Sequence, residues 1–341
     1  MITALLSVVL VVASAVITRQ LIVNSHRFSK MDIPNERSSH ITPTPRGGGI
    51  AFVATSLVGF LLLLLNNALN ESELFALCCA GVIVAIAGHL DDRQKISGAT
   101  VRLVLHVISA IILIVGVGIP SELALVDRTV NTGIVGSILG VVYLVWLLNL
   151  FNFIDGTDGI AASEAIFVCA AGAFLNYHVL SDANHSATAV ILAASTFGFI
   201  LYNWSPAKVF MGDVGSGYLG VVIGGLSLIA ANQDPDLLWV WIILLAVFVS
   251  DATVTLIRRL LRKQKPHVAH RSHAYQHLAI RLNSHAKVAI LVLAVNTIWL
   301  LPIAFLIADN QLAGTTGVII AYTPLLIAAL ALGAGKDSAT N

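Results

Sequence analysis

The chain has 341 residues, of which 57% are apolar and 11% charged, with a formal net charge of +1. Because soluble domains carry about one quarter charged residues, this composition, with a mean hydropathy of +0.89, excludes an ordinary soluble protein. A net charge near zero says nothing by itself about partners, and we predict no nucleic-acid partner.

Apolar runs long enough to cross a bilayer recur along the whole chain. A transmembrane helix needs about 20 mostly apolar residues, and its backbone polar groups are satisfied within the helix. We therefore predict an all-α polytopic integral membrane protein, formed by a single transmembrane domain over residues 1–341. The predicted spans, about 11 in number, are residues 1–18, 48–66, 74–90, 101–119, 134–151, 160–178, 187–203, 214–231, 237–257, 288–307 and 315–334.

Positive charge lies almost entirely on one side of the predicted membrane. Each of the 19 Lys and Arg residues except Arg128 falls in alternate loops, at the span ends beside them, or in the tail. Because cytoplasmic loops carry an excess of Lys and Arg, that side is predicted to be cytoplasmic, with the N-terminus outside and the C-terminus inside. The predicted cytoplasmic loops are residues 19–47, 91–100, 152–159, 204–213 and 258–287.

Five aspartates gather at this predicted cytoplasmic face. They lie in "GHLDDRQK" (88–95), "NLFNFIDGTDG" (149–159) and "FMGDVGSG" (210–217), and they are Asp91, Asp92, Asp155, Asp158 and Asp213. Carboxylates without thiolates favour a hard cation, and Mg²⁺ is usually held by one or two carboxylates together with substrate phosphates. The pattern predicts a Mg²⁺ site for a nucleotide or diphosphate substrate, with Mn²⁺ able to substitute. Helix capping is the alternative explanation for any single motif.

Cationic side chains suited to phosphate lie on the same predicted face. Lys95 follows the first aspartate pair, and "HRSH" (270–273) supplies His270, Arg271 and His273. Arg suits bidentate contact with a diphosphate, and His can donate to the same oxygens. Zinc bound by the two histidines and His277 is the alternative, although no carboxylate or cysteine completes that set. Membrane topology and anionic lipids alone account for the basic run 258–265.

Two further acids, Glu164 and Asp251, lie inside predicted spans. An ionisable residue within a span indicates a functional role by default. Both lie near the predicted cytoplasmic ends of their spans, where water can reach them, so a structural role stays equally open.

Taken together, these motifs resemble those of a known family. "DDRQK" resembles its DDxxK motif, and "NLFNFIDGTDGIAA" resembles its NxxNxxDGxDGLA motif, with Ile160 in place of Leu. "FMGDVGS", "HRSH" and the segment 31–49 resemble its other cytoplasmic blocks. Over about residues 31–285 the chain thus resembles the polyprenyl-phosphate N-acetylhexosamine-1-phosphate transferases, bacterial glycosyltransferase family 4.

The resemblance implies a reaction and roles for particular residues. Such enzymes move a sugar 1-phosphate from a UDP-sugar to undecaprenyl phosphate in the bacterial inner (cytoplasmic) membrane, and they release UMP. It implies that Asp213 with Asn152 forms the Mg²⁺ site. It also implies that Asp91 and Asp92 interact with the acceptor phosphate or with the metal. Asp155 and Asp158 are implied to act in nucleotide binding and catalysis. The implied substrate contacts are Lys95, Asn149, His270, Arg271 and His273.

One departure bears on the branch of the family. The branch that transfers phospho-MurNAc-pentapeptide carries consecutive histidines in its last cytoplasmic loop, whereas Arg271 and Ser272 separate His270 from His273 here. The chain looks more like the branch that begins O-antigen or related surface polysaccharides. The implied partners are a UDP-N-acetylamino sugar, undecaprenyl phosphate and membrane lipid. The sugar is GlcNAc or a 6-deoxy sugar such as FucNAc or QuiNAc, and a homodimer is one option for assembly.

Two other classes of protein remain as alternatives. A membrane transporter with a one-sided acidic site is the main one, but transporters hold ionisable groups near the bilayer midplane, often between inverted repeats. The acids here cluster at one face, and the sequence has no evident repeat. A phosphotransferase of the CDP-alcohol type would carry a compact DGxxAR motif, which this sequence lacks.

Overall fold

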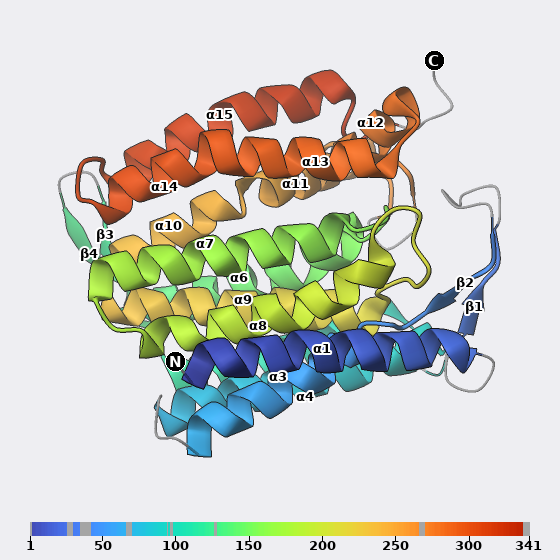
Figure 1. Cartoon of the computed structure of the whole chain (residues 1–341). Coiled ribbons are helices and arrows are strands. Elements are labelled where there is room, and N and C mark those ends of the chain that lie inside the picture. Colours follow the sequence, from blue (N-terminus) through green and yellow to red (C-terminus); the bar gives the residue numbers. More distant parts are fainter. Residues whose placement is uncertain are drawn as a thin grey trace.

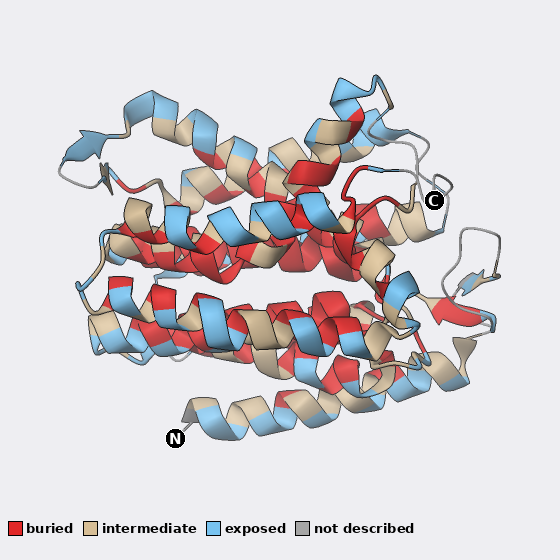
Figure 2. Ribbon diagram, turned by 90° about the horizontal axis from the view of Figure 1, so that it is seen from above, coloured by how far each residue is buried: buried red, intermediate tan, exposed pale blue. Residues whose placement is uncertain are grey.

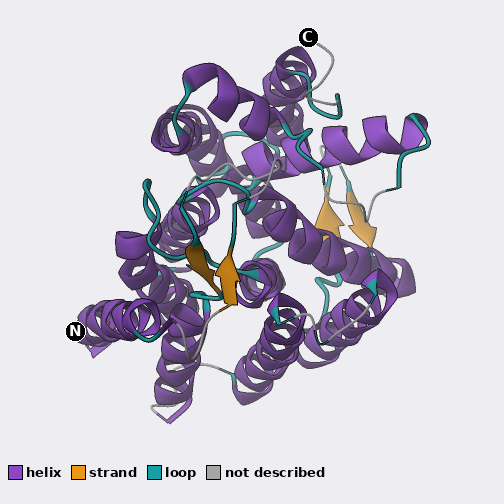
Figure 3. Cartoon of the chain, turned by 90° about the vertical axis from the view of Figure 1, so that its right-hand side faces the viewer, coloured by secondary structure: helices purple, strands orange, loops and turns teal. Residues whose placement is uncertain are grey.

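A computed structural model describes residues 2–25, 30–34, 42–65, 70–93, 95, 98–125, 128–265 and 270–336. These residues form a bundle of long helices that run roughly parallel or antiparallel to one another (Figure 1), as the end-on view in Figure 3 also shows. The helices are α1 (Ile2–Val23), α3 (Ile50–Leu65), α4 (Glu71–Asp92), α5 (Ala99–Val117), α6 (Gly133–Ile154), α7 (Ile160–Leu180), α8 (Asn184–Asn203), α9 (Asp213–Gln233), α10 (Asp236–Leu244), α11 (Ala246–Leu261), α12 (Ala274–Leu282), α13 (His285–Val295), α14 (Leu301–Ala308) and α15 (Gly314–Leu332).

The all-α, multi-pass prediction is confirmed. Among the described residues, nine helices are long and apolar enough to cross a membrane, and the bent pair α10 and α11 raises this to ten. The remaining predicted span, 48–66, corresponds to the shorter apolar helix α3. The span predicted over 237–257 corresponds to two helices rather than one, because α10 and α11 meet at an angle of 70°. Neither Gly nor Pro marks this break at Leu245, so the sequence carries no signal for it.

Helix α9 lies at the centre of the bundle. The apolar stretch of α9 is buried throughout, and the helix packs against α4 and α6. Close approach of the backbones depends on glycine: a Cβ atom added to Gly220 would lie 2.6 Å from the carbonyl oxygen of Leu147 on α6. Figure 2 shows buried residues concentrated in the inner helices and exposed ones on the outer faces.

The outer faces of the bundle are apolar as well. Val115 on α5 and Ile134 on α6 are about four-fifths exposed, and large aliphatic side chains of α1 and α15 are exposed too. Soluble proteins rarely expose contiguous apolar patches of this extent, so the surface is suited to contact with lipid chains. The chain is therefore a multi-pass membrane protein.

Two short antiparallel hairpins lie at opposite ends of the bundle (Figure 1). One pairs β1 (Lys30–Asp32) with β2 (Thr44–Arg46), and the other pairs β3 (Glu122–Ala124) with β4 (Thr129–Asn131). Helix α1 starts at the β3–β4 end, and α15 finishes at the β1–β2 end, beside α12. The two ends of the described chain thus lie on opposite faces, as an odd number of spans requires; which face is cytoplasmic stays a prediction.

Glu164 on α7 makes a structural contact inside the bundle. Its Oε2 atom accepts a hydrogen bond of 2.5 Å from the side-chain amide of Asn296, and both residues are fully buried. Asn296 opens a five-residue π-helical segment, Asn296–Leu300, which joins α13 to α14. Of the two roles open to Glu164 from the sequence, this contact supports the structural one.

Candidate active site

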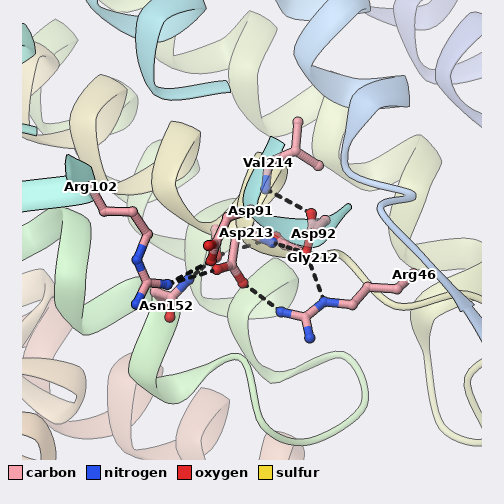
Figure 4. Close-up of polar contacts among 9 residues, drawn as sticks. Arg46, Asp91, Asp92, Arg102, Asn152, Gly212, Asp213 and Val214 are labelled. Carbon is pink, nitrogen blue, oxygen red and sulfur yellow. Dashed lines mark hydrogen bonds and ion pairs between the residues drawn. The ribbon is translucent and has the colours of Figure 1, made fainter. Parts of the chain in front are cut away.

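Three aspartates from two distant segments meet at the β1–β2 end of the bundle (Figure 4). Asp91 and Asp92 end α4, and Asp213 begins α9. The helices approach closely because Gly88 has no side chain: a Cβ atom there would lie 2.4 Å from the carbonyl group of Asp213. We call Asp91, Asp92 and Asp213 the acid cluster. Its members are largely withdrawn from solvent, with side-chain exposures of 22%, 6% and 13%.

Two arginines connect the acid cluster. The Nε atom of Arg46 lies 2.8 Å from Asp92, and its Nη2 atom lies 2.5 Å from Asp213. On the other side, Nη1 of Arg102 lies 2.7 Å from Asp91 and 3.4 Å from Asp213. Burial opposes the charge of Arg46, but the nearby carboxylates of Asp213 and Asp92 hold its pKa above the ordinary value. The cluster is thus bridged by two cations.

Backbone pairing brings Arg46 to this position. The Phe210 amide donates to the carbonyl of Pro45 at 2.9 Å, and the Gly48 amide donates back to the carbonyl of Phe210 at 2.9 Å. The segment after β2 therefore runs alongside the "FMGD" segment that leads into α9. This pairing holds a side chain from the first loop next to Asp213.

Asp92 differs from its neighbour Asp91 in what it contacts. Its two carboxylate oxygens accept hydrogen bonds from the backbone amides of Asp213 and Val214, at 3.1 and 3.2 Å, in addition to the ion pair with Arg46. A carboxylate at a helix N-terminus satisfies free amide groups and interacts favourably with the helix dipole. Asp92 therefore fixes the start of α9 to the end of α4.

Asn152, near the end of α6, is next to Asp213 as the predicted metal site requires. Its side chain hydrogen-bonds with the carboxylate of Asp213, and its amide donates to the Ser216 hydroxyl at 3.4 Å. Within the described residues, no group of three or more His, Cys, Asp or Glu side chains is arranged to hold a metal ion.

A cavity of about 650 Å³ opens beside the acid cluster, and we call it the membrane cavity. Polar side chains line one end of it, including Asp91, Arg102, Asn152 and Asp213, with His270 and His273. Its other walls are apolar and belong to the spans α4, α5 and α6, through Val84, Leu103 and Leu148. Such a cavity can accept a molecule with a charged head and a hydrocarbon tail.

A second cavity of about 560 Å³, the loop cavity, is lined mainly by loops and by α12. Its walls include Asp158, Phe210, Arg271 and Gln276, together with Thr42, Thr44, Gly156, Thr157, Ser205 and Asn283. The loop cavity therefore offers several hydrogen-bonding groups and one aromatic face. The two cavities share walls, since the segments 152–158 and 270–276 contribute residues to both.

The "DGTDG" segment contributes Gly156, Thr157 and Asp158 to the wall of the loop cavity. Burial raises the pKa of Asp155 well above its ordinary range, against the effect of Arg46, while Asp213 and Asp92 raise it further. Burial acts the same way on Asp158, but a 3.3 Å contact with His285 outweighs it and lowers the pKa of Asp158 below its ordinary value. The Ala207 amide also donates to Asp158, at 3.2 Å. The pKa of Asp155 is thus raised, whereas that of Asp158 is lowered, so Asp155 holds its proton more readily than Asp158 does.

Asp251 on α11 organises the "HRSH" loop. Its carboxylate accepts hydrogen bonds from the backbone amides of Ala274 and Tyr275, both at 2.9 Å, and lies 3.2 Å from Nδ1 of His273. It thereby caps the N-terminus of α12 and orients the His273 ring, whose centroid is 5.1 Å from that of His270 in a stacked arrangement. Asp251, whose role the sequence left open, is a positioning residue here.

The residues after α15 hold this loop from the other side. The Gly335 amide donates to the carbonyl of Ser272 at 2.7 Å. Arg258 and Arg262 on α11 donate to the carbonyls of Ala334 and Gly335, at 2.8 and 2.9 Å. His277 faces the carbonyl of Leu332 at 3.0 Å rather than the other two histidines, so this arrangement does not support the zinc alternative.

The predicted site residues are distributed over this region as follows. Asp91, Asn149, Asn152, Asp213, His270 and His273 line the membrane cavity, whereas Asp158 and Arg271 line the loop cavity. Asp92 belongs to the acid cluster and Asp155 lies close to it, and the described linings of the two cavities include neither residue. Lys95 is exposed, and neither cavity includes it in its described lining.

Four contributing residues were missed by the sequence reasoning. Arg46 and Arg102 were counted only as topological charges, although each is a lone cation directly before or within the first turn of an apolar helix. Tyr275, whose hydroxyl donates to the carbonyl of Phe153 at 3.1 Å, and His285, the partner of Asp158, carried no recognisable signal.

A helical membrane bundle with an acid–arginine cluster beside a cavity lined by spans and a second, polar cavity defines a class of protein: an integral-membrane protein with a charged site at one end of the bundle. The model of glycosyl transferase family 4 matches residues 74–231. A Bacillus subtilis protein named probable undecaprenyl-phosphate N-acetylglucosaminyl 1-phosphate transferase is 31% identical over 300 residues, covering 80% of each chain. This chain belongs to glycosyl transferase family 4, as its motifs predicted.

Two more distant relatives match most of the chain as well. A Mycobacterium leprae protein named decaprenyl-phosphate N-acetylglucosaminephosphotransferase is 26% identical and covers 79% of this chain and 74% of its own. A Prochlorococcus marinus protein named phospho-N-acetylmuramoyl-pentapeptide-transferase is 27% identical, with 73% and 70% covered. The similarity therefore extends well beyond the segment that the family model matches.

Proposed function

We propose that this protein transfers an N-acetylhexosamine 1-phosphate group from a UDP-sugar to undecaprenyl phosphate and releases UMP. The names of the Bacillus and Mycobacterium relatives describe transfer of this kind to polyprenyl phosphates. Since both names specify N-acetylglucosamine, we favour GlcNAc as the donor sugar over the 6-deoxy sugars FucNAc and QuiNAc. The proposed product is the first lipid-linked intermediate of a surface polysaccharide such as O-antigen, made on the cytoplasmic side of the inner membrane.

The adjacency of the two cavities is the observation that carries this proposal. The membrane cavity has apolar walls formed by spans and a charged end formed by Asp91, Arg102 and Asp213, which suits a lipid phosphate. The loop cavity has hydroxyl, amide and carboxylate groups beside Phe210 and Arg271, which suits a nucleotide. Because the segments 152–158 and 270–276 line both, two bound substrates would meet between them.

The residues present fit a Mg²⁺ ion brought by the diphosphate. Four carboxylates, from Asp91, Asp92, Asp155 and Asp213, lie near two guanidinium groups, and the pKa of Asp155 is raised by burial and by the neighbouring carboxylates of Asp213 and Asp92. Mg²⁺ commonly takes one or two carboxylates and completes its coordination with phosphate oxygens and water. Asp213 and Asn152 would hold it, and when bound it would neutralise the diphosphate and stabilise the leaving group.

The chain's own residues would align the substrates. An oxygen of the undecaprenyl phosphate attacks the β-phosphorus of the UDP-sugar, and the bond from that phosphorus to the bridging oxygen breaks, so that UMP leaves with that oxygen. Arg102 would orient the acceptor phosphate, while Arg46 and Arg271 would hold the diphosphate from the other side. A phosphate monoester is already largely ionised at neutral pH, so positioning, which can lower the barrier by roughly 7–11 kcal/mol, would supply most of the catalysis.

The test is nucleotide release by the purified protein in detergent. Undecaprenyl phosphate, Mg²⁺ and a panel of UDP-N-acetylhexosamines are supplied, and UMP is separated from UDP by chromatography. We expect UMP that depends on both lipid and Mg²⁺, with UDP-GlcNAc as the preferred donor. Release of UDP would instead indicate ordinary glycosyl transfer, and release of neither nucleotide by folded protein would favour the transporter alternative.

A further inference from the structure

His106 has a place in the membrane cavity that neither the motifs nor the mechanism above use. It lies on α5, one helical turn after Arg102, and both side chains line the cavity. The opposite face of α5, which includes Val104, Ile108 and Val115, is exposed to the lipid side. Because residues four apart share one face of a helix, His106 extends the polar end of the cavity one turn deeper into the membrane.

The surroundings of His106 give its ring no evident structural task. Its Nδ1 atom is buried and has no hydrogen-bond partner among the residues that the structure describes. The lining of the cavity includes the apolar side chains of Val84 and Leu148 on the facing helices, together with the polar side chain of Asn149. One N–H of the Asn149 amide donates to the carbonyl of Val145 at 2.7 Å. A buried polar group without a partner is unfavourable, and an ionisable residue within a span indicates function.

We propose that His106 is a substrate-contacting residue that donates a hydrogen bond to the phosphate of the lipid acceptor, on the tail side of Arg102. This inference rests on the proposed function, because it assumes a lipid phosphate in the membrane cavity. A phosphate monoester on a long hydrocarbon tail must lie where the charged end of the cavity gives way to apolar walls, and His106 is at that boundary. Arg102 contacts the phosphate on the side of the acid cluster, and His106 contacts it on the side of the hydrocarbon tail.

The inference predicts a selective effect on one substrate. In the UMP-release assay, His106→Leu should raise the KM for undecaprenyl phosphate about tenfold, with the KM for the UDP-sugar changed less than twofold. His106→Gln keeps an N–H donor of similar reach and should recover most of the affinity for lipid. His185→Leu, on α8 at the opposite end of the bundle, is the matched control and should leave both constants unchanged.

A binding measurement keeps the test decisive if a variant turns over too slowly. Undecaprenyl phosphate without donor should raise the melting temperature of the wild-type protein and of His106→Gln, and should raise that of His106→Leu much less. An unchanged KM for lipid and an unchanged melting shift in folded His106→Leu would overturn the role of His106 while leaving the proposed function intact. Absence of lipid-dependent UMP from the wild-type protein would instead reject the proposed function itself.

Discussion

Replacing Asp92 by Asn tests whether this residue anchors α9 or acts on a substrate. The carboxylate receives three donors: the amides of Asp213 and Val214 and the Nε of Arg46, the last at 2.8 Å. An asparagine keeps one acceptor oxygen and turns an NH₂ group toward a donor. The change loses about one hydrogen bond to a charged group and leaves a buried donor unsatisfied, which together destabilise the protein by about 3 kcal/mol.

The neighbouring Asp91 provides a matched control. Asp91 has one ion pair, with Arg102, and it is more exposed, so Asp91→Asn should cost about 1 kcal/mol or less. At about 2 °C per kcal/mol for a large domain, Asp92→Asn should lower the melting temperature by about 6 °C and Asp91→Asn by less than about 2 °C. The measurement is thermal unfolding in detergent followed by tryptophan fluorescence, with UMP release measured on the same samples. An unchanged melting temperature in an inactive Asp92→Asn protein would refute the anchoring role.

Three further predictions follow from the same region. Asp213→Asn should abolish UMP release while the protein stays folded by tryptophan fluorescence; retained activity would reject the metal assignment. Gly88→Ala places a Cβ atom against the Asp213 carbonyl and should lower both activity and melting temperature, whereas Val82→Ala, on the exposed face of α4, should lower neither by much. Because the pKa of Asp158 is lowered on folding, its stabilising effect is complete above its ordinary pKa of about 3.9 and is lost as the pH falls through the folded value. The melting temperature of the wild-type protein should therefore fall more steeply below pH 4 than that of Asp158→Asn; parallel curves would contradict the contact with His285.

Much of the fold followed from the hydropathy pattern, because a span must be apolar and helical to cross the hydrocarbon layer. The bend of 70° between α10 and α11 did not, since neither Gly nor Pro lies at Leu245, where the two helices meet.

The site was predictable to the extent that its chemistry is local in sequence. The acids in "DDRQK" and "FMGD" were expected at one face, and the structure brings Asp91 and Asp213 together there. The partners of these acids were not predictable: Arg46 reaches Asp213 only through backbone pairing between two loops. Counting Lys and Arg in the loops also cannot distinguish a cation that sets the orientation of the protein in the membrane from one that bridges carboxylates. Arg102 was therefore interpreted only as a charge that marks the cytoplasmic side.

The attachment of the "HRSH" loop to the segment after α15 sets an order on the protein's synthesis. The carbonyls that receive Arg258 and Arg262, and the amide that binds Ser272, belong to residues 334 and 335, which leave the ribosome long after the loop itself. A nascent chain that has inserted every helix before α15 has the acid cluster but lacks these contacts to the histidine loop. The contacts that hold the histidine loop therefore become complete only after α15 has been inserted.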